Sequence, residues 1–238
     1  MFITPFAQKV VSAALAGFFI AAGIITFGDA SKFDRLYIAI IIAIAVYVRK
    51  DVNLLGVIFI LAFERVVEEL VWLTTFGDNG FKWIVYLVCA LGLCHERKAK
   101  APCFFYLTLI YLLTVSSELY WLATGYNAPQ IYWYLFLVAN TVFIRNLFIL
   151  RPFRTAEYFP SEAEPLRIDH HLHNIFAFFI WINIAMIVEY LLRHLVGLNH
   201  VLYVYNSFEY IVHIIATAIL FNLTDQSIKV ANKRLIKV

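Results

Sequence analysis

Charged side chains are scarce in this chain of 238 residues, where Asp, Glu, Lys and Arg together make up only 15% of the sequence. Soluble globular domains carry about 25% charged residues, so this composition excludes an ordinary soluble protein. The formal net charge of +3 also leaves no strongly basic surface. We therefore expect no nucleic-acid partner.

Cysteines and catalytic motifs are scarce as well. Cys89, Cys94 and Cys103 are an odd number of cysteines and lack the spacing of a metal site. We expect them to be buried or interfacial thiols. The sequence has no GxGxxG, Walker A, GxSxG or HExxH pattern, which are the motifs of nucleotide, hydrolase and zinc-protease sites. No cofactor is therefore expected, and an enzyme, such as one acting on lipid, is the least favoured class.

Hydrophobic residues are abundant, at 63% of the chain with a mean hydropathy of +0.79. They gather in apolar runs at residues 10–27, 36–48, 54–76, 81–94, 103–124, 131–150, 172–196 and 201–223. A helix of roughly 20 apolar residues crosses a bilayer, and the first run is too long for a signal peptide, whose apolar stretch is about 7 to 15 residues. The sequence predicts an all-α, multi-pass transmembrane bundle of about eight helices, in a single integral membrane domain at 1–238.

Three segments share a pattern that predicts an internal repeat. They are EELVWLTTFGDNGFKWIVY (68–86), SELYWLATGYNAPQIYWY (117–134) and VEYLLRHLVGLNHVLYVY (188–205). In each, a glutamate precedes a glycine, an asparagine and a tyrosine, and the glycines are Gly77, Gly125 and Gly197, with Gly28 in the first hairpin. A period near 48 residues predicts four parallel helical hairpins, at about 7–50, 51–99, 100–151 and 170–225.

The repeat bears on the two short runs, 36–48 and 81–94. They occupy the place that full spans occupy in the other hairpins, so we expect both to cross the membrane. Re-entrant or interfacial segments are the alternative. A bland explanation of the glycines also stays open, because turns favour Gly at positive φ and apolar sequences resemble one another by coincidence.

The basic residues predict an orientation. Those assigned to one side are Lys9, Arg49, Lys50, Arg97, Lys98, Lys100, Arg151, Arg154, Arg167, Lys229, Lys233, Arg234 and Lys237, and those assigned to the other are Lys32, Arg35 and Lys82. The positive-inside rule then puts both termini, a loop at 151–171 and a basic tail at 224–238 in the cytoplasm, as in a bacterial inner membrane. Expected partners are membrane lipids and either another membrane protein or a second copy of the chain.

Ionisable residues interrupt the apolar runs. They are Glu64, Arg65, Glu68, Glu69, Glu118, Glu189, Glu209 and His213. A rise of about 1.5 Å per residue places most of the carboxylates roughly 4 to 8 Å outside the midplane, with Asn140, Asn183 and His213 near it. Each charge in lipid costs about 2.5 to 3.5 kcal/mol, so we expect this carboxylate layer to face other helices or a water-filled cavity.

Some of these side chains have a partner one turn away on their own helix. The expected pairs are Arg65 with Glu69, Glu189 with Arg193, and Glu209 with His213. Such pairs would neutralise one another and lock the bundle. Arg145 is expected either to be a counter-ion for the same layer or to reach the cytoplasmic surface.

The pairs leave some carboxyl groups over. Glu118 has no cation among its turn neighbours, and Glu64 and Glu68 outnumber the single arginine on their helix. Desolvation without a cation favours the protonated acid. Glu118 and either Glu64 or Glu68 are therefore the candidates for a site that titrates or holds a cation.

Two other constellations carry less weight. In RIDHHLHN (167–174), Asp169 and His173 stand four residues apart and are a weak metal candidate beside a proline-containing loop. A haem with two histidine ligands is disfavoured, because His213 lies near the midplane and His194 and His200 lie near the outer surface.

Tryptophans accompany the repeat. Trp72 and Trp121 occupy matching positions and fit an outer aromatic belt, with a stacking site for a sugar or a cation as the alternative.

The hypothesis that follows is a transporter or channel whose outer-half carboxylate layer binds a cation or a proton. The alternative is a non-enzymatic membrane scaffold, or a subunit of an envelope complex, in which the charged layer is a structural or partner-binding core. Glu118 separates the two, because a carboxylate without a partner favours transport.

Overall fold

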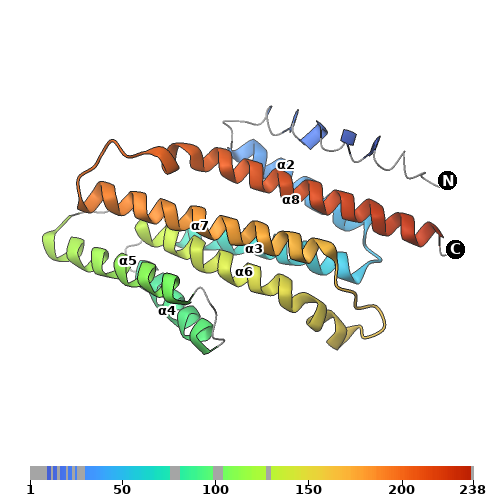
Figure 1. Cartoon of the computed structure of the whole chain (residues 1–238), viewed down its shortest axis with the longest axis horizontal. Coiled ribbons are helices and arrows are strands. Elements are labelled where there is room, and N and C mark those ends of the chain that lie inside the picture. The colour runs from blue at the N-terminus through green and yellow to red at the C-terminus, as the bar shows by residue number, and fades with distance from the viewer. Residues whose placement is uncertain are drawn as a thin grey trace. The chain divides into compact units, whose positions relative to one another are not determined.

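The computed structural model describes residues 30–75, 81–98, 104–126 and 130–236, together with some positions between 10 and 25 (Figure 1). Its elements are α2 (Ala30–Tyr47), α3 (Val52–Thr75), α4 (Phe81–Lys98), α5 (Phe104–Thr124), α6 (Ile131–Tyr158), α7 (Arg167–Leu195) and α8 (Tyr203–Ile236). Residues of a preceding helix lie between Val10 and Ile25. Within these ranges there is no strand, so the predicted all-α fold of about eight helices is confirmed.

Four helices are long and apolar enough to cross a membrane, by length and composition. They are α5, α6, α7 and the Tyr203–Val230 part of α8. Such a content of long apolar helices is that of a membrane protein. Each of α2, α3 and α4 includes three or more charged residues, so full spans at 36–48 and 81–94 remain a prediction.

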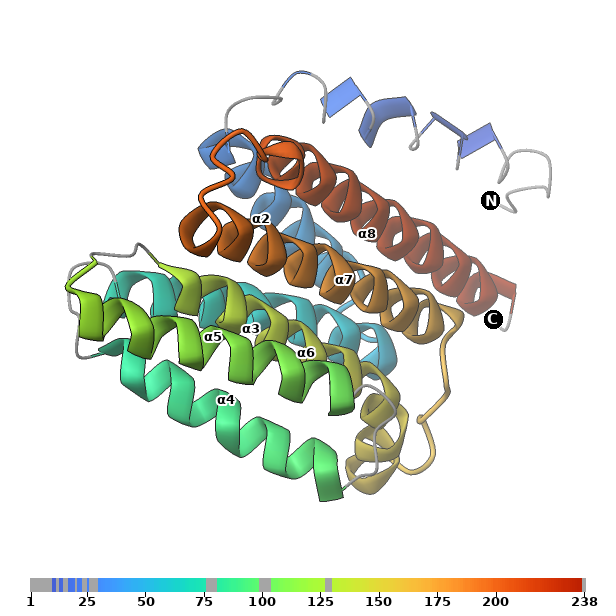
Figure 2. The ribbon, with the colours of Figure 1, turned by 60° about the vertical axis from the view of Figure 1, so that its left-hand side comes forward.

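The chain divides into two compact units. Unit 1 contains Met1–Phe63, Asn146–Ile175 and Ser207–Val238, and unit 2 contains Glu64–Arg145 and Phe176–Asn206. In unit 2, α4 and α5 pack side by side (Figure 2). The sequence pattern explains which faces are buried: Leu54, Val57 and Leu61 recur every three or four residues along α3 and are completely buried.

Capping residues set several helix ends. The Oδ1 atom of Asp51 accepts the Leu54 N–H at 2.9 Å and so caps the start of α3. After α5, Gly125 has φ 68° and Tyr126 N–H bonds to Trp121 O at 3.0 Å, a glycine-dependent helix end. Gly197, after α7, has φ 79°.

These two glycines have the conformation expected of turn glycines. Gly28, Gly77 and Cys103 lie outside the described residues, and the fourfold hairpin repeat stays a prediction. Cys89 is buried and Cys94 is exposed.

Helices α6 and α8 extend beyond the ends of their apolar runs. Helix α6 continues through Pro152 to Tyr158, and α7 begins at Arg167, so the irregular connection covers 159–166 of the expected loop 151–171. Helix α8 continues through most of the basic tail, to Ile236. Buried side chains explain the extension of α6, because Arg151 and Thr155 lie one turn apart and are both buried.

Candidate functional site

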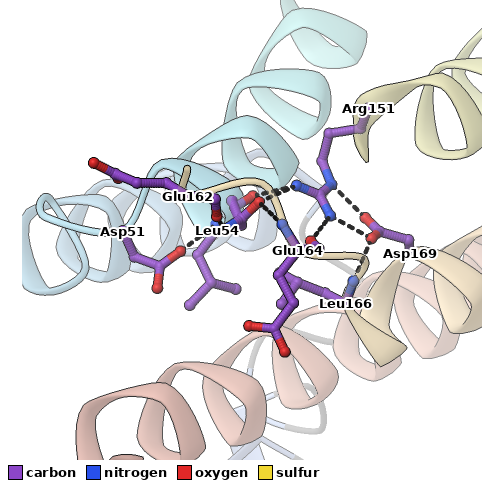
Figure 3. A network of polar contacts seen from close by, with 8 residues as sticks. Asp51, Leu54, Arg151, Glu162, Glu164, Leu166 and Asp169 are labelled. Carbon is purple, nitrogen blue, oxygen red and sulfur yellow. Dashed lines mark hydrogen bonds and ion pairs between the residues drawn. The ribbon is translucent and has the colours of Figure 1, made fainter. Parts of the chain in front are cut away.

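Arg151 on α6 is the centre of a polar network in unit 1 (Figure 3). Its Nε and Nη2 atoms donate to Oδ1 and Oδ2 of Asp169 at 2.7 and 2.5 Å. The remaining donors reach Asn53 on α3, at its O and Oδ1 atoms (3.3 and 3.2 Å), and Glu164 O at 3.0 Å. Only 4% of Arg151 is exposed. Such a two-point guanidinium–carboxylate contact is among the strongest hydrogen-bonded pairs in proteins.

The partners of Arg151 are satisfied in turn. Asn53 Nδ2 donates to Glu162 O at 2.7 Å, and Asn53 Oδ1 accepts from Glu164 N at 3.0 Å. Asp169 Oδ2 also accepts the Leu166 N–H at 2.9 Å, which caps the start of α7. We call Arg151, Asp169, Asn53 and the backbone of 162–166 the Arg151 network. Its hydrogen bonds connect the start of α3, the last part of α6 and the start of α7.

This network gives Asp169 a different role from the weak metal site. Both of its carboxylate oxygens are engaged by Arg151, and His173 is only half-buried. Across the described ranges, no group of three or more His, Cys, Asp and Glu side chains could hold a metal ion. The sequence gives no direct signal for this pairing, because its charge pattern places Arg151 among several basic residues of a loop.

In unit 2, Glu118 has a cation beside it. Lys82 Nζ on α4 donates to Glu118 Oε1 at 2.6 Å, and Tyr86 OH donates to Oε2 at 3.4 Å. The prediction that Glu118 lacks a cationic partner is wrong. The lysine comes from a neighbouring helix, 36 residues away in sequence, whereas turn neighbours report on a single helix.

Four rings form a cluster around Trp121 of α5, which also contains Tyr126 just after that helix and Tyr190 and His194 near the end of α7. The centroids of Tyr126, Tyr190 and His194 lie 6.2, 6.1 and 6.2 Å from that of Trp121, and Tyr126 OH lies 2.9 Å from His194 Nδ1. Trp121 is 2% exposed. It therefore packs in the core of unit 2 rather than in an outer belt. Trp72 is exposed, and the centroid of its ring lies 5.0 Å from that of Trp133 on α6.

Glu189 caps a neighbouring helix. Its two carboxylate oxygens accept the N–H groups of Val204 and Tyr205, in the first turn of α8, at 2.7 and 2.9 Å. Backbone donors at a helix start are unsatisfied and carry positive partial charge, so they attract a carboxylate. The predicted pairing of Glu189 with Arg193 is wrong. The Arg193 guanidinium lies over the Tyr205 ring, 5.8 Å from its centroid.

The charges of α3 pair differently from expectation. Arg65 Nη1 donates to Glu68 Oε2 at 3.3 Å, one position short of the predicted partner Glu69. Glu69 is exposed, so it does not face the interior as the carboxylate layer was expected to do.

The predicted pair on α8 is also not formed. Glu209 is exposed, whereas His213 is 7% exposed and its ring packs 4.2 Å from that of Phe33 in unit 1. Packing against Phe33 holds the His213 ring in the interior, so the ring is not presented to the exposed carboxylate of Glu209. Arg145 is half-buried on α6.

Glu64 is the buried carboxyl group that these pairings leave over. It is 7% exposed, and in the part of the chain that the structure describes it takes part in no hydrogen bond or ion pair. Because Arg65 is paired with Glu68 and Glu69 is exposed, Glu64 is the buried carboxyl group of α3 for which the described residues supply no such partner. The Glu64 candidate from the sequence therefore keeps its unusual environment, and the Glu118 candidate does not.

Two asparagine side chains of unit 2 are also buried and have polar atoms without a hydrogen-bond partner among the described residues. Asn140 on α6 is 6% exposed and Asn183 on α7 is fully buried. Among the described residues, Asn140 Nδ2 and both polar atoms of Asn183 have no hydrogen-bond partner. Such groups are rare in folded proteins, where buried polar atoms are normally bonded to protein groups, ordered water or ions.

Comparison with known proteins leaves the site to be interpreted from its own geometry. No protein-family model, no curated protein and no solved structure matches this chain.

Proposed function

We propose that this chain is a multi-pass integral membrane transporter or channel that moves a proton or a small cation, with Glu64 as the responsive carboxyl group. Its termini are cytoplasmic, and its membrane is a bacterial inner membrane. The observation that carries the proposal is the burial of Glu64 without a hydrogen-bond or ion-pair partner among the described residues. Buried ionisable side chains in membrane helices commonly mark ion or proton pathways.

The physical argument rests on the cost of an unmatched charge. An isolated carboxylate in a low-dielectric interior costs several kcal/mol, so the group takes up a proton or binds a cation. Glu118, Glu189 and Glu68 avoid this cost through Lys82, the start of α8 and Arg65. Glu64 is therefore the carboxyl group best suited to change its state during transport.

The test is ion flux in liposomes that contain the purified chain. The parent protein should carry proton or cation current under an imposed gradient, and Glu64→Gln should reduce it to the level of empty liposomes. Glu209→Gln is the matched control, since Glu209 is an exposed carboxylate, and it should keep parental flux. Normal flux in Glu64→Gln, or no flux of the parent under any gradient, would sink the proposal.

A second candidate function is a membrane scaffold or a subunit of an envelope complex. It is favoured by Glu69, which is exposed on α3 among Val66, Leu70 and Leu73, exposed by 56, 57 and 70%. A carboxylate on an apolar outer face suits a partner helix that carries a base. Extraction in mild detergent should then recover a stable partner that Glu69→Leu releases, and a chain that is always solitary contradicts this function.

A further inference from the structure

The levels of polar residues along neighbouring helices follow from the side-chain contacts between those helices. In unit 2, Trp72 of α3 lies against Trp133 of α6, and in unit 1 Asn53 of α3 is bonded to Arg151 of α6. Residue numbers thus rise along α3 as they fall along α6, so the helices are antiparallel. Glu64 is eight residues from Trp72 and Asn140 is seven from Trp133, which are axial distances of about 12 and about 10.5 Å. The two residues therefore lie at nearly the same level.

The same reasoning connects α6 with α7. Tyr134 of α6 lies 6.0 Å from Tyr190 of α7, and Arg151 of α6 is bonded to Asp169 of α7, so this pair is antiparallel too. Asn140 is six residues beyond Tyr134 and Asn183 is seven before Tyr190, at axial distances of about 9 and about 10.5 Å. Asn183 is therefore level with Asn140.

The faces agree as well as the levels. A separation of seven residues is close to two helical turns, so Asn140 lies on the side of α6 where Trp133 meets α3, and Asn183 lies on the side of α7 where Tyr190 meets α6. Glu64 is eleven residues, close to three helical turns, after Asn53, so it lies on the side of α3 where Asn53 meets Arg151 of α6. Three buried polar side chains from three helices thus share one layer, which we call the Glu64 layer.

The three side chains of the layer do not satisfy one another's hydrogen-bonding groups. Glu64, Asn140 and Asn183 form no hydrogen bond with one another in the described part of the chain, and each is at least nine-tenths buried. Buried carboxyl and carboxamide groups are normally satisfied. Because no hydrogen bond would be broken, each carboxamide is free to turn its oxygen toward a ligand.

We infer that the Glu64 layer binds one monovalent inorganic cation, with Glu64 supplying the charge and Asn140 and Asn183 supplying neutral oxygens. Carboxylate and carbonyl oxygens are the ligands that hard cations prefer. A single carboxylate neutralises one positive charge, so a divalent ion would leave a net charge in a low-dielectric interior. The inference rests on the proposed function and deepens it by naming the site and favouring a cation over a proton.

The test is thermal unfolding of the full-length protein in detergent micelles. Chlorides of Li⁺, Na⁺ and K⁺ are compared with choline chloride at equal ionic strength. One of the small cations should raise Tm by about 5 °C at saturation, because a ligand that binds the folded state stabilises it. Glu64→Gln keeps the size of the side chain and removes its charge, so it should abolish this shift.

The asparagines have a matched control. Asn140→Leu and Asn183→Leu should each raise the cation concentration needed for a half-maximal shift by about tenfold, which corresponds to one lost ligand. Asn222→Leu should leave that concentration unchanged, because Asn222 on α8 donates its Nδ2 to Ala218 O of its own helix at 2.7 Å. If a leucine variant does not fold, Glu64→Gln decides the outcome alone.

Two results would overturn the inference: equal Tm in all four salts, or a cation-specific shift that persists in Glu64→Gln. They are distinguishable from failure of the proposed function. Proton flux that depends on Glu64, without a cation-specific shift, keeps the proposed function and removes the cation site. A cation-specific shift lost in Glu64→Gln, without any flux, keeps the site and removes transport.

Discussion

The Arg151 network of unit 1 and the Glu64 layer of unit 2 are two buried polar clusters with opposite hydrogen bonding. In the first, Arg151 contacts Asp169, Asn53 and Glu164 through all three guanidinium nitrogens. In the second, the side chain of Asn183 makes no hydrogen bond with any described residue, despite complete burial. A buried cluster that satisfies itself stabilises architecture, whereas one that does not requires a partner from outside the chain. The contrast assigns structure to one cluster and ion binding to the other.

The largest expected effect belongs to the Arg151 network. Arg151→Ala leaves Asp169 buried without its cation and should lower the free energy of unfolding by about 3 to 5 kcal/mol. Arg154→Ala on the same helix is the control, because its ion pair with Glu157 at 3.0 Å is exposed, and such pairs contribute about 1 kcal/mol or less. Denaturant titration in micelles measures both. Equal stability of the two variants would remove the structural role of the network.

The Lys82–Glu118 pair should show an intermediate effect. Lys82→Met strands a buried carboxylate, and adding Glu118→Gln removes the stranded charge, so the double variant should be more stable than Lys82→Met alone. A double-mutant cycle by thermal unfolding should give a coupling energy of about 1 to 3 kcal/mol. Additive effects would mean that Glu118 does not depend on Lys82, and would restore it as a transport candidate.

The smallest expected effect is at Glu189. Glu189→Gln keeps an acceptor but removes the charge at the start of α8, which should cost about 1 kcal/mol. Glu209→Gln is the control, since Glu209 is an exposed carboxylate on α8 itself. Unfolding followed by circular dichroism compares them. A greater loss in Glu209→Gln would contradict the capping role.

The fold class was predictable because long apolar runs are a local property of the sequence. The end of α6 was not, since the burial of Arg151 and Thr155 beyond the apolar run depends on tertiary packing. Glu64 was foreseen as an excess carboxyl group from its own helix. The cationic partner of Glu118 was not predictable in this way, because Lys82 reaches it from α4.

The predicted pair at Glu189 shows a second limit. Arg193 stands at the right spacing on the same helix, yet the carboxylate binds two backbone N–H groups of α8. Spacing along one helix identifies which side chains are able to meet. It does not reveal competing donors that another helix brings close.

An experimental density map of the protein in lipid nanodiscs, with small cations present, tests the central claim most directly. The account predicts a non-protein peak within ligand distance of the Glu64 carboxyl group and of the Asn140 and Asn183 carboxamides. A layer in which these three groups bond only to one another, or are enclosed by apolar side chains without such a peak, would contradict it.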